Sequence, residues 1–228
     1  MNNLRCYTFS VLFLLASVSA VAGTFFTTRD FSCNERSDSM AFAARVDFPL
    51  TGNAAAMRSV KRWICDVLDI DTPQTMDESN FENFLRVSCS QYFETGGQSK
   101  RKVEISRTYE DNTLVTYESL VEDRDSETWM SADCATFSKI DGHRLTVKEI
   151  FKCGEAQIKQ LMWQYRGDLP MEVSKPEELV VGDAGYIDGW VVVIGPAYHH
   201  TGAEYRIRYE AAQPYLRTGK HGEYYSME

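Results

Sequence analysis

Two hydrophobic periods follow one another in residues 42–68, FAARVDFPLTGNAAAMRSVKRWICDVL. Phe42, Val46 and Phe48 follow the two-residue period of a strand with one buried face, which Pro49 ends. After a turn at residues 51–53, apolar residues recur in steps of three and four, which predicts an amphipathic helix over residues 54–68. The apolar stripe of this helix comprises Met57, Val60, Ile64, Val67 and Leu68.

The same helical period predicts two further helices. Asp77 is a suitable N-cap for the first, which ends near the glycines at positions 96 and 97. Its apolar face comprises Phe81, Phe84, Leu85, Cys89 and Tyr92. Thr146 and Glu149 have the spacing of a capping box, and the helix beyond them ends at Gly167 and Pro170. The apolar face of that helix comprises Ile158, Leu161, Met162 and Tyr165.

The remaining hydrophobic patterns predict strands at residues 103–109, 114–121, 130–138, 190–194 and 204–210. Asp141-Gly142 marks a tight return after the third of these, and Gly195-Pro196 ends the fourth. Strands and helices are interleaved without the regular alternation of a parallel sheet. We therefore expect an α+β fold in which a largely antiparallel sheet packs with three or so amphipathic helices.

The composition is that of a folded domain. The chain has 228 residues, of which 43% are hydrophobic, and its formal net charge is −9. It can bury a sizeable core, which excludes disorder and coiled coil. Nucleic-acid binding would require a clustered basic face, and an acidic chain gives no reason to be drawn to phosphate backbones, so we expect no nucleic-acid partner.

A secretory signal peptide is predicted over residues 1–22. Arg5 precedes an apolar run at residues 6–18, and Ala20 and Ala22 are small residues of the kind that signal peptidase reads. The run is too short for a membrane span, so we expect cleavage after Ala22, no stable span afterwards, and a periplasmic or extracellular location. Retention as an anchor is the alternative. The rest divides into a strand-helix-helix subregion at 23–100, an α+β subregion at 101–216 and a frayed tail at 217–228.

The mature chain keeps an odd number of cysteines, and an oxidising compartment allows them to pair. These disulfide candidates are Cys33, Cys65, Cys89, Cys134 and Cys153. Their wide spacing, with no histidine two to four residues away, gives no support for a metal site. We predict one or two disulfides and at least one buried thiol, and we leave the connectivity open.

No catalytic motif emerges from the sequence. His199 and His200 are adjacent, so on an extended segment they point to opposite faces and cannot easily chelate one ion. A buried thiol on an apolar helix face, as an unpaired Cys89 would be, has a raised pKa and is inert. We therefore predict no catalytic residues, no metal and no cofactor. Two alternatives to a binding module stay open, a small envelope hydrolase with an unrecognised site and a structural subunit of an envelope assembly.

Four segments carry a resemblance to a known family. They are RVDFPLTGNAAAMRSVKRWI at 45–64, NTLVTYESL at 112–120, ATFSKIDGHRLTVKEIF at 135–151 and YIDGWVVVIGPAYHHTGAEYRIRYEAAQPYL at 186–216. Together they resemble the RsiV-type extracytoplasmic domain. This region consists of two adjoining domains of unknown function, which also occur in the deacetylase PdaC. The resemblance implies a recognition module, since the RsiV ectodomain binds lysozyme.

We expect a non-catalytic binding module for a protein, lysozyme-like in kind, or for a cell-envelope component. Recognition usually falls to loops on a rigid scaffold, and two segments fit that description. The residues expected to make contact are Tyr198, His199 and His200 in one, and Glu122, Asp123 and Asp125 in the other. An acidic surface favours a basic partner such as lysozyme.

Overall fold

The computed structural model describes residues 25–36, 41–70, 77–94, 100–124, 128–167, 173–198 and 201–217. Several predictions concern residues outside these ranges. They are the signal peptide at 1–22, the contact residues Asp125, His199 and His200, and the tail beyond Arg217.

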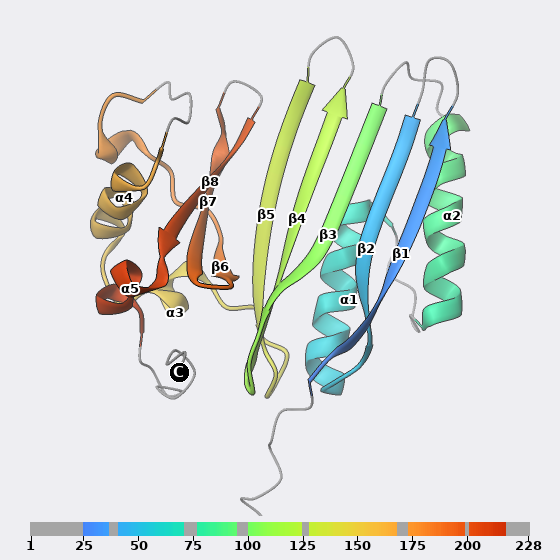
Figure 1. Ribbon diagram of the computed structural model, residues 1–228, viewed down its shortest axis with the longest axis horizontal. Helices are drawn as coiled ribbons and strands as arrows, with labels where there is room; N and C mark the ends of the chain where they lie inside the picture. The colour runs from blue at the N-terminus through green and yellow to red at the C-terminus, as the bar shows by residue number, and fades with distance from the viewer. Residues whose placement is uncertain are drawn as a thin grey trace, which may run out of the picture.

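A five-stranded sheet forms the larger part of the molecule (Figure 1). Its strands, in spatial order, are β1 (Thr27–Arg36), β2 (Ala41–Thr51), β3 (Lys100–Glu110), β4 (Leu114–Arg124) and β5 (Thr128–Ser138). Neighbouring strands are antiparallel except β2 and β3, which are parallel because two helices connect them. The expected α+β class with a largely antiparallel sheet is confirmed. Since β2 pairs with β3, the subregions predicted at 23–100 and 101–216 share this sheet.

Helices α1 (Ala54–Leu68) and α2 (Glu78–Glu94) cover one face of the sheet. The bounds of α1 are those predicted from its apolar period. The Asn53 side chain accepts hydrogen bonds from the first-turn amides at 2.9 and 3.2 Å. Asp77 caps α2 as predicted, since its carboxylate accepts from the Asn80 amide at 2.8 Å. Phe81 of α2 stacks on Phe48 of β2, with 4.1 Å between ring centroids.

The edge strand β1 was not expected from the sequence. Its residues, TTRDFSCNER, contain only Phe31 and Cys33 as apolar side chains on the helix-covered face. An edge strand needs few apolar residues, because one of its neighbours is solvent. The Cys33–Cys89 disulfide ties β1 to α2, so the expectation of at least one disulfide is confirmed. Cys65, Cys134 and Cys153 carry thiols, and the first two of these are buried.

Further along the chain a second, three-stranded antiparallel sheet forms, whereas the sequence predicted a single sheet. It consists of β6 (Ala184–Ile187), β7 (Trp190–Tyr198) and β8 (Thr201–Arg208). Around it lie α3 (Val147–Ile150), α4 (Glu155–Gln164), α5 (Tyr209–Ala212) and two 3-10 turns at Pro176–Glu178 and Gln213–Tyr215. These elements share a core of their own, so the described residues form two large hydrophobic cores.

Three strand predictions need correction. Gly195-Pro196 does not end β7, which continues to Tyr198 through an irregularity in its register with β8. Residues 209–210 begin helix α5 instead of extending β8, although the Tyr209 side chain is buried as the alternation required. After Asp141-Gly142 the chain does not return as a full strand. It makes a single bridge between Phe137 and Arg144 and then enters α3.

The three-stranded sheet packs on the face of β4 and β5 that the helices leave open. Gly185 of β6 makes this approach possible, because a Cβ there would overlap the Cys134 sulfur of β5. Cys134 lies in a small apolar cluster with Val192 and Ile194 of β7. The Thr108 hydroxyl donates to the Tyr186 carbonyl oxygen at 3.0 Å, which joins β3 to β6.

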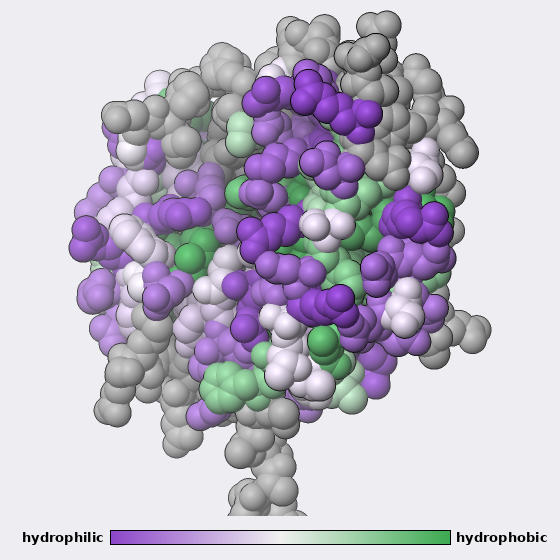
Figure 2. Space-filling model, turned by 45° about the vertical axis from the view of Figure 1, so that its right-hand side comes forward, coloured by the Kyte–Doolittle hydropathy of each residue, from purple (hydrophilic) through white to green (hydrophobic). Residues whose placement is uncertain are grey.

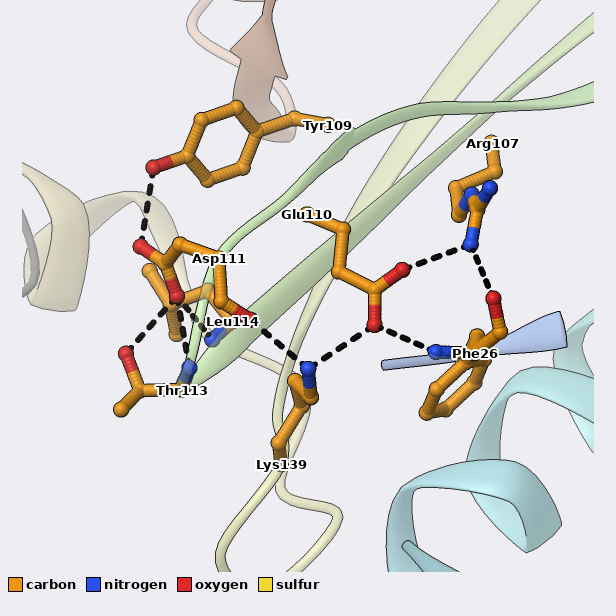
Figure 3. Close-up of polar contacts among 8 residues, drawn as sticks. All are labelled: Phe26, Arg107, Tyr109, Glu110, Asp111, Thr113, Leu114 and Lys139. Carbon is orange, nitrogen blue, oxygen red and sulfur yellow. Dashed lines mark hydrogen bonds and ion pairs between the residues drawn. The ribbon is translucent and has the colours of Figure 1, made fainter. Parts of the chain in front are cut away.

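A buried ionic network anchors the described start of the chain (Figure 3). Lys139 Nζ lies 2.8 Å from Glu110 Oε1 and 2.7 Å from the Asp111 carbonyl oxygen. Arg107 Nη1 donates to Glu110 Oε2 at 2.6 Å and to the Phe26 carbonyl oxygen at 2.7 Å. The Lys139 and Glu110 side chains are 1% and 7% exposed. One carboxylate therefore contacts two cations and holds Phe26 against the turn between β3 and β4.

Candidate functional site

The described residues of the two predicted contact segments lie at the same end of the molecule. Glu122 and Asp123 lie near the end of β4, and Tyr198 is the last residue of β7. In Figure 1, the end of β4, the start of β5, and the β7 and β8 ends that adjoin each other all lie at the upper end. We call this the hairpin end, defined by Arg124, Thr128, Tyr198 and Thr201.

A hollow of about 260 Å³ opens beside Arg124 at the hairpin end. It is lined by Ala41, Ala43, Lys100, Arg101, Lys102, Glu122 and Arg124. Four of these seven side chains are basic and one is acidic, which contrasts with the net charge of −9 for the whole chain. The lining of this hollow is thus cationic.

The acidic residues expected to make contact have cationic neighbours. Glu122 accepts a hydrogen bond from Arg124, two residues away. Asp123 lies 3.8 Å from Arg101, its register partner on β3. The charge of this part of the predicted acidic segment is therefore balanced locally. Sequence reasoning missed the cations, although Lys100-Arg101-Lys102 is a visible basic run.

A pair of carboxylates lies at the seam between the two sheets. Glu118 of β4 is 10% exposed in its side chain, and its Oε1 lies 3.9 Å from Arg206 of β8. Arg206 also binds Glu204 on the same strand. Burial, and after it the neighbouring Glu204 carboxylate, raise the pKa of Glu118 to about 7 against the opposing effect of Arg206. Glu118 and Glu204 lie between packed strands and line neither hollow described here, so the pair fits packing better than substrate binding.

This seam predicts a pH-dependent stability. The folded protein holds a proton on Glu118 up to about pH 7, whereas the unfolded chain releases it near 4.5. The contribution of Glu118 is therefore fully present below pH 4.5 and is lost as the pH rises through 7. We expect Glu118→Gln to remove this loss, so that the variant melts higher than the parent at pH 8 but not at pH 5. Thermal melts across this range measure the difference, and parallel profiles would contradict the assignment.

Cys153 lies in a second hollow, of about 390 Å³, between α3 and α4. The walls are mostly apolar, with Lys148 and Arg217 among the lining residues. Burial raises the pKa of the Cys153 thiol, and burial likewise raises that of Cys134 well above the ordinary value. Because the thiolate is the nucleophile, neither sulfur is activated for catalysis.

The described residues contain no group of three or more histidine, cysteine, aspartate or glutamate side chains that could hold a metal ion. His143 lies 3.0 Å from Glu149 Oε1, and its side chain is half exposed. The Glu149 carboxylate also accepts from the Thr146 amide at 2.8 Å, as the predicted capping box requires. In the part of the chain that the structure describes, no helix is both long and apolar enough to cross a membrane.

The exposed surface is mainly polar. Figure 2 shows hydrophilic side chains over most of one side of the molecule, with hydrophobic colour in smaller areas between them. Among the described residues, the exposed large hydrophobic side chains are those of Phe25, Met130, Ile140 and Val180, from four separate segments.

Solved structures with the same fold come from the DUF3298 family. A member from Bacteroides fragilis superposes with a TM-score of 0.65 at 11% sequence identity, over 91% of this chain and 99% of that one. A DUF3298 protein from Pseudomonas aeruginosa gives a TM-score of 0.51 at 10% identity, over 87% of this chain and 97% of that one. A scan of the sequence against protein families finds no match, and neither does a search of curated proteins. At these identities the likeness shows the fold, which is that of a domain of unknown function.

Proposed function

We propose that the protein is an exported, non-catalytic recognition module of the RsiV type. Its hairpin end binds a protein, lysozyme-like in kind, or a component of the cell envelope. The observation that carries the proposal is that Glu122, Asp123 and Tyr198, from two contact segments predicted separately, lie at the same end of a double-sheet scaffold. Rigid sheets that hold loops at a common end are a frequent basis for recognition sites.

Two further observations support the proposal. The Cys33–Cys89 disulfide is compatible with an oxidising compartment outside the cytoplasm. The DUF3298 fold agrees with the resemblance of the four sequence segments to a domain of unknown function that serves in extracytoplasmic recognition. The RsiV-type assignment itself rests on those segments.

Charge would attract the two proposed classes of partner in different ways. The net charge of −9 steers basic proteins such as lysozyme toward the molecule from a distance. The cations around the 260 Å³ hollow favour an anionic envelope component at close range. Both attractions weaken as salt is added, because they act between exposed charges.

Pull-down from envelope extract, with purified lysozyme in a parallel sample, tests the proposal. We expect the immobilised full chain to retain a partner at low salt. The variants Glu122→Gln/Asp123→Asn and His199→Ala/His200→Ala alter the hairpin end, and each should change retention several-fold. The matched control is Asp188→Asn/Glu210→Gln, which removes two exposed negative charges at the other end of β7 and in α5. No retained partner, or equal retention by all variants, would reject the proposal.

A further inference from the structure

A row of cations crosses the open face of the five-stranded sheet at the hairpin end. Arg36 pairs with Ala41 across β1 and β2, Ala41 pairs with Lys100, and Lys100 pairs with Arg124. Directly opposed residues of neighbouring strands present their side chains on the same face. Arg36, Lys100 and Arg124 therefore lie in one row on this face. Ala41 of β2 lies between Arg36 and Lys100. With strands about 4.8 Å apart, the row spans roughly 14 Å.

The alanines leave room above the sheet between these cations. Ala41 and Ala43 of β2 line the 260 Å³ hollow. The alternate residues Phe42 and Ala44 point to the opposite face, into the core under the helices. Lys102, the register partner of Ala43, adds a fourth cation to the same face. The hollow is thus floored by methyl groups and bordered by ammonium and guanidinium groups.

Charge on this open face is less balanced at the row than further along the strands. Within the described residues, Arg36 and Lys100 form no ion pair, while Arg124 binds Glu122 and Lys102 lies 2.9 Å from Glu104. Toward the other end of the sheet, Asp30 and Asp47 oppose each other on the same face, and Asp30 pairs with Arg45 at 2.7 Å. An anion would therefore be attracted to the row, where two cations lie without an ion pair among the described residues.

We infer that this row binds the oxyanion groups, phosphate or carboxylate, of an extended anionic envelope polymer laid across the ends of β1 to β4. Guanidinium groups pair with planar or tetrahedral oxyanions through two N–H donors, and lysine adds a point charge. A polymer can place successive anionic groups along a row of roughly this length. The inference rests on the proposed function, because it specifies the ligand chemistry of the same hairpin end.

Calorimetric titration of the full chain with two short anionic probes, each with three anionic units, tests the inference. Inorganic tripolyphosphate represents a phosphate polymer and trigalacturonate a carboxylate polymer. We expect at least one probe to bind at about 20 mM salt and to bind less tightly at about 300 mM. Lys100→Gln/Arg124→Gln should weaken that binding on the order of ten-fold or more, because two charge-assisted contacts are lost. The better probe identifies the oxyanion.

The control variant is Arg58→Gln/Arg86→Gln. It makes the same change in net charge at exposed positions of α1 and α2, on the opposite side of the sheet. Its affinity should stay within about two-fold of the parent, since these residues lie far from the row on the screening scale. If neither probe binds the parent, or if both variants weaken binding equally, the inference is wrong. A partner retained in the pull-down together with no anion binding would reject the inference alone and leave the proposed function standing.

Discussion

Replacing Glu110 by glutamine is expected to lower the free energy of unfolding by about 3–5 kcal/mol, because it leaves Lys139 buried without its counter-charge. The substitution keeps the size of the side chain and an oxygen that can accept from the Phe26 amide, now 2.7 Å from Glu110 Oε1. It removes the negative charge that pairs with both Lys139 and Arg107. Urea denaturation at neutral pH measures the loss.

A double-mutant cycle separates this charge effect from a packing effect. Glu110→Gln/Lys139→Met removes both buried charges and should recover most of the loss, since a buried pair can often be replaced by apolar groups at little cost. Glu104→Gln is the matched control on the same strand. It breaks the exposed pair with Lys102 and should cost only about 0–1 kcal/mol. A Glu110→Gln loss no larger than this control would show that the network does not anchor the fold.

Removing the disulfide should have an effect of similar size. Cys33→Ser/Cys89→Ser opens a loop of sequence separation 56, for which the chain-entropy relation predicts a loss of about 4 kcal/mol in unfolding free energy. The edge strand β1 and helix α2 should lose their attachment first, because the bridge joins these two elements. Hydrogen exchange would then show the amides of β1 and α2 opening more often than those of β6 to β8.

Two measurements check the pairing itself. Reduction of the denatured parent should raise the count of reactive thiols by two, and an unchanged count would contradict the Cys33–Cys89 bridge. Cys153→Ser is the control variant, because it alters a half-buried thiol outside the disulfide. It should change the unfolding free energy by less than about 1 kcal/mol, and reducing agent should destabilise it as much as it destabilises the parent.

Local features of the fold could be predicted with good accuracy. The bounds of α1, the Asp77 cap of α2 and the Thr146–Glu149 capping box all appear where the sequence places them. Each depends on residues that are close together in the chain. The alternation over residues 204–210 places Tyr205 and Tyr209 on one face, and both side chains are buried, although the second residue belongs to a helix. Burial therefore follows the two-residue period even at Tyr209, where the backbone is helical.

Features that depend on distant pairing could not be predicted. The polar strand β1 is recognisable only beside β2, and Cys89 finds its partner only because α2 lies against that strand. The cationic row combines Arg36, Lys100 and Arg124 from three strands, so no spacing in the sequence reveals it. The same holds for the seam, where Glu118 of β4 meets Arg206 of β8.

The sequence by itself determined the α+β class, the positions of the main helices and strands, and the presence of a disulfide. It could do so because hydrophobic period, capping and turn chemistry act over a few residues. The tertiary structure decided the division into two sheets, the parallel pairing of β2 with β3, and the gathering of charge at the hairpin end. These depend on which faces are buried against each other, and the free energy of that burial is shared among residues far apart in the chain.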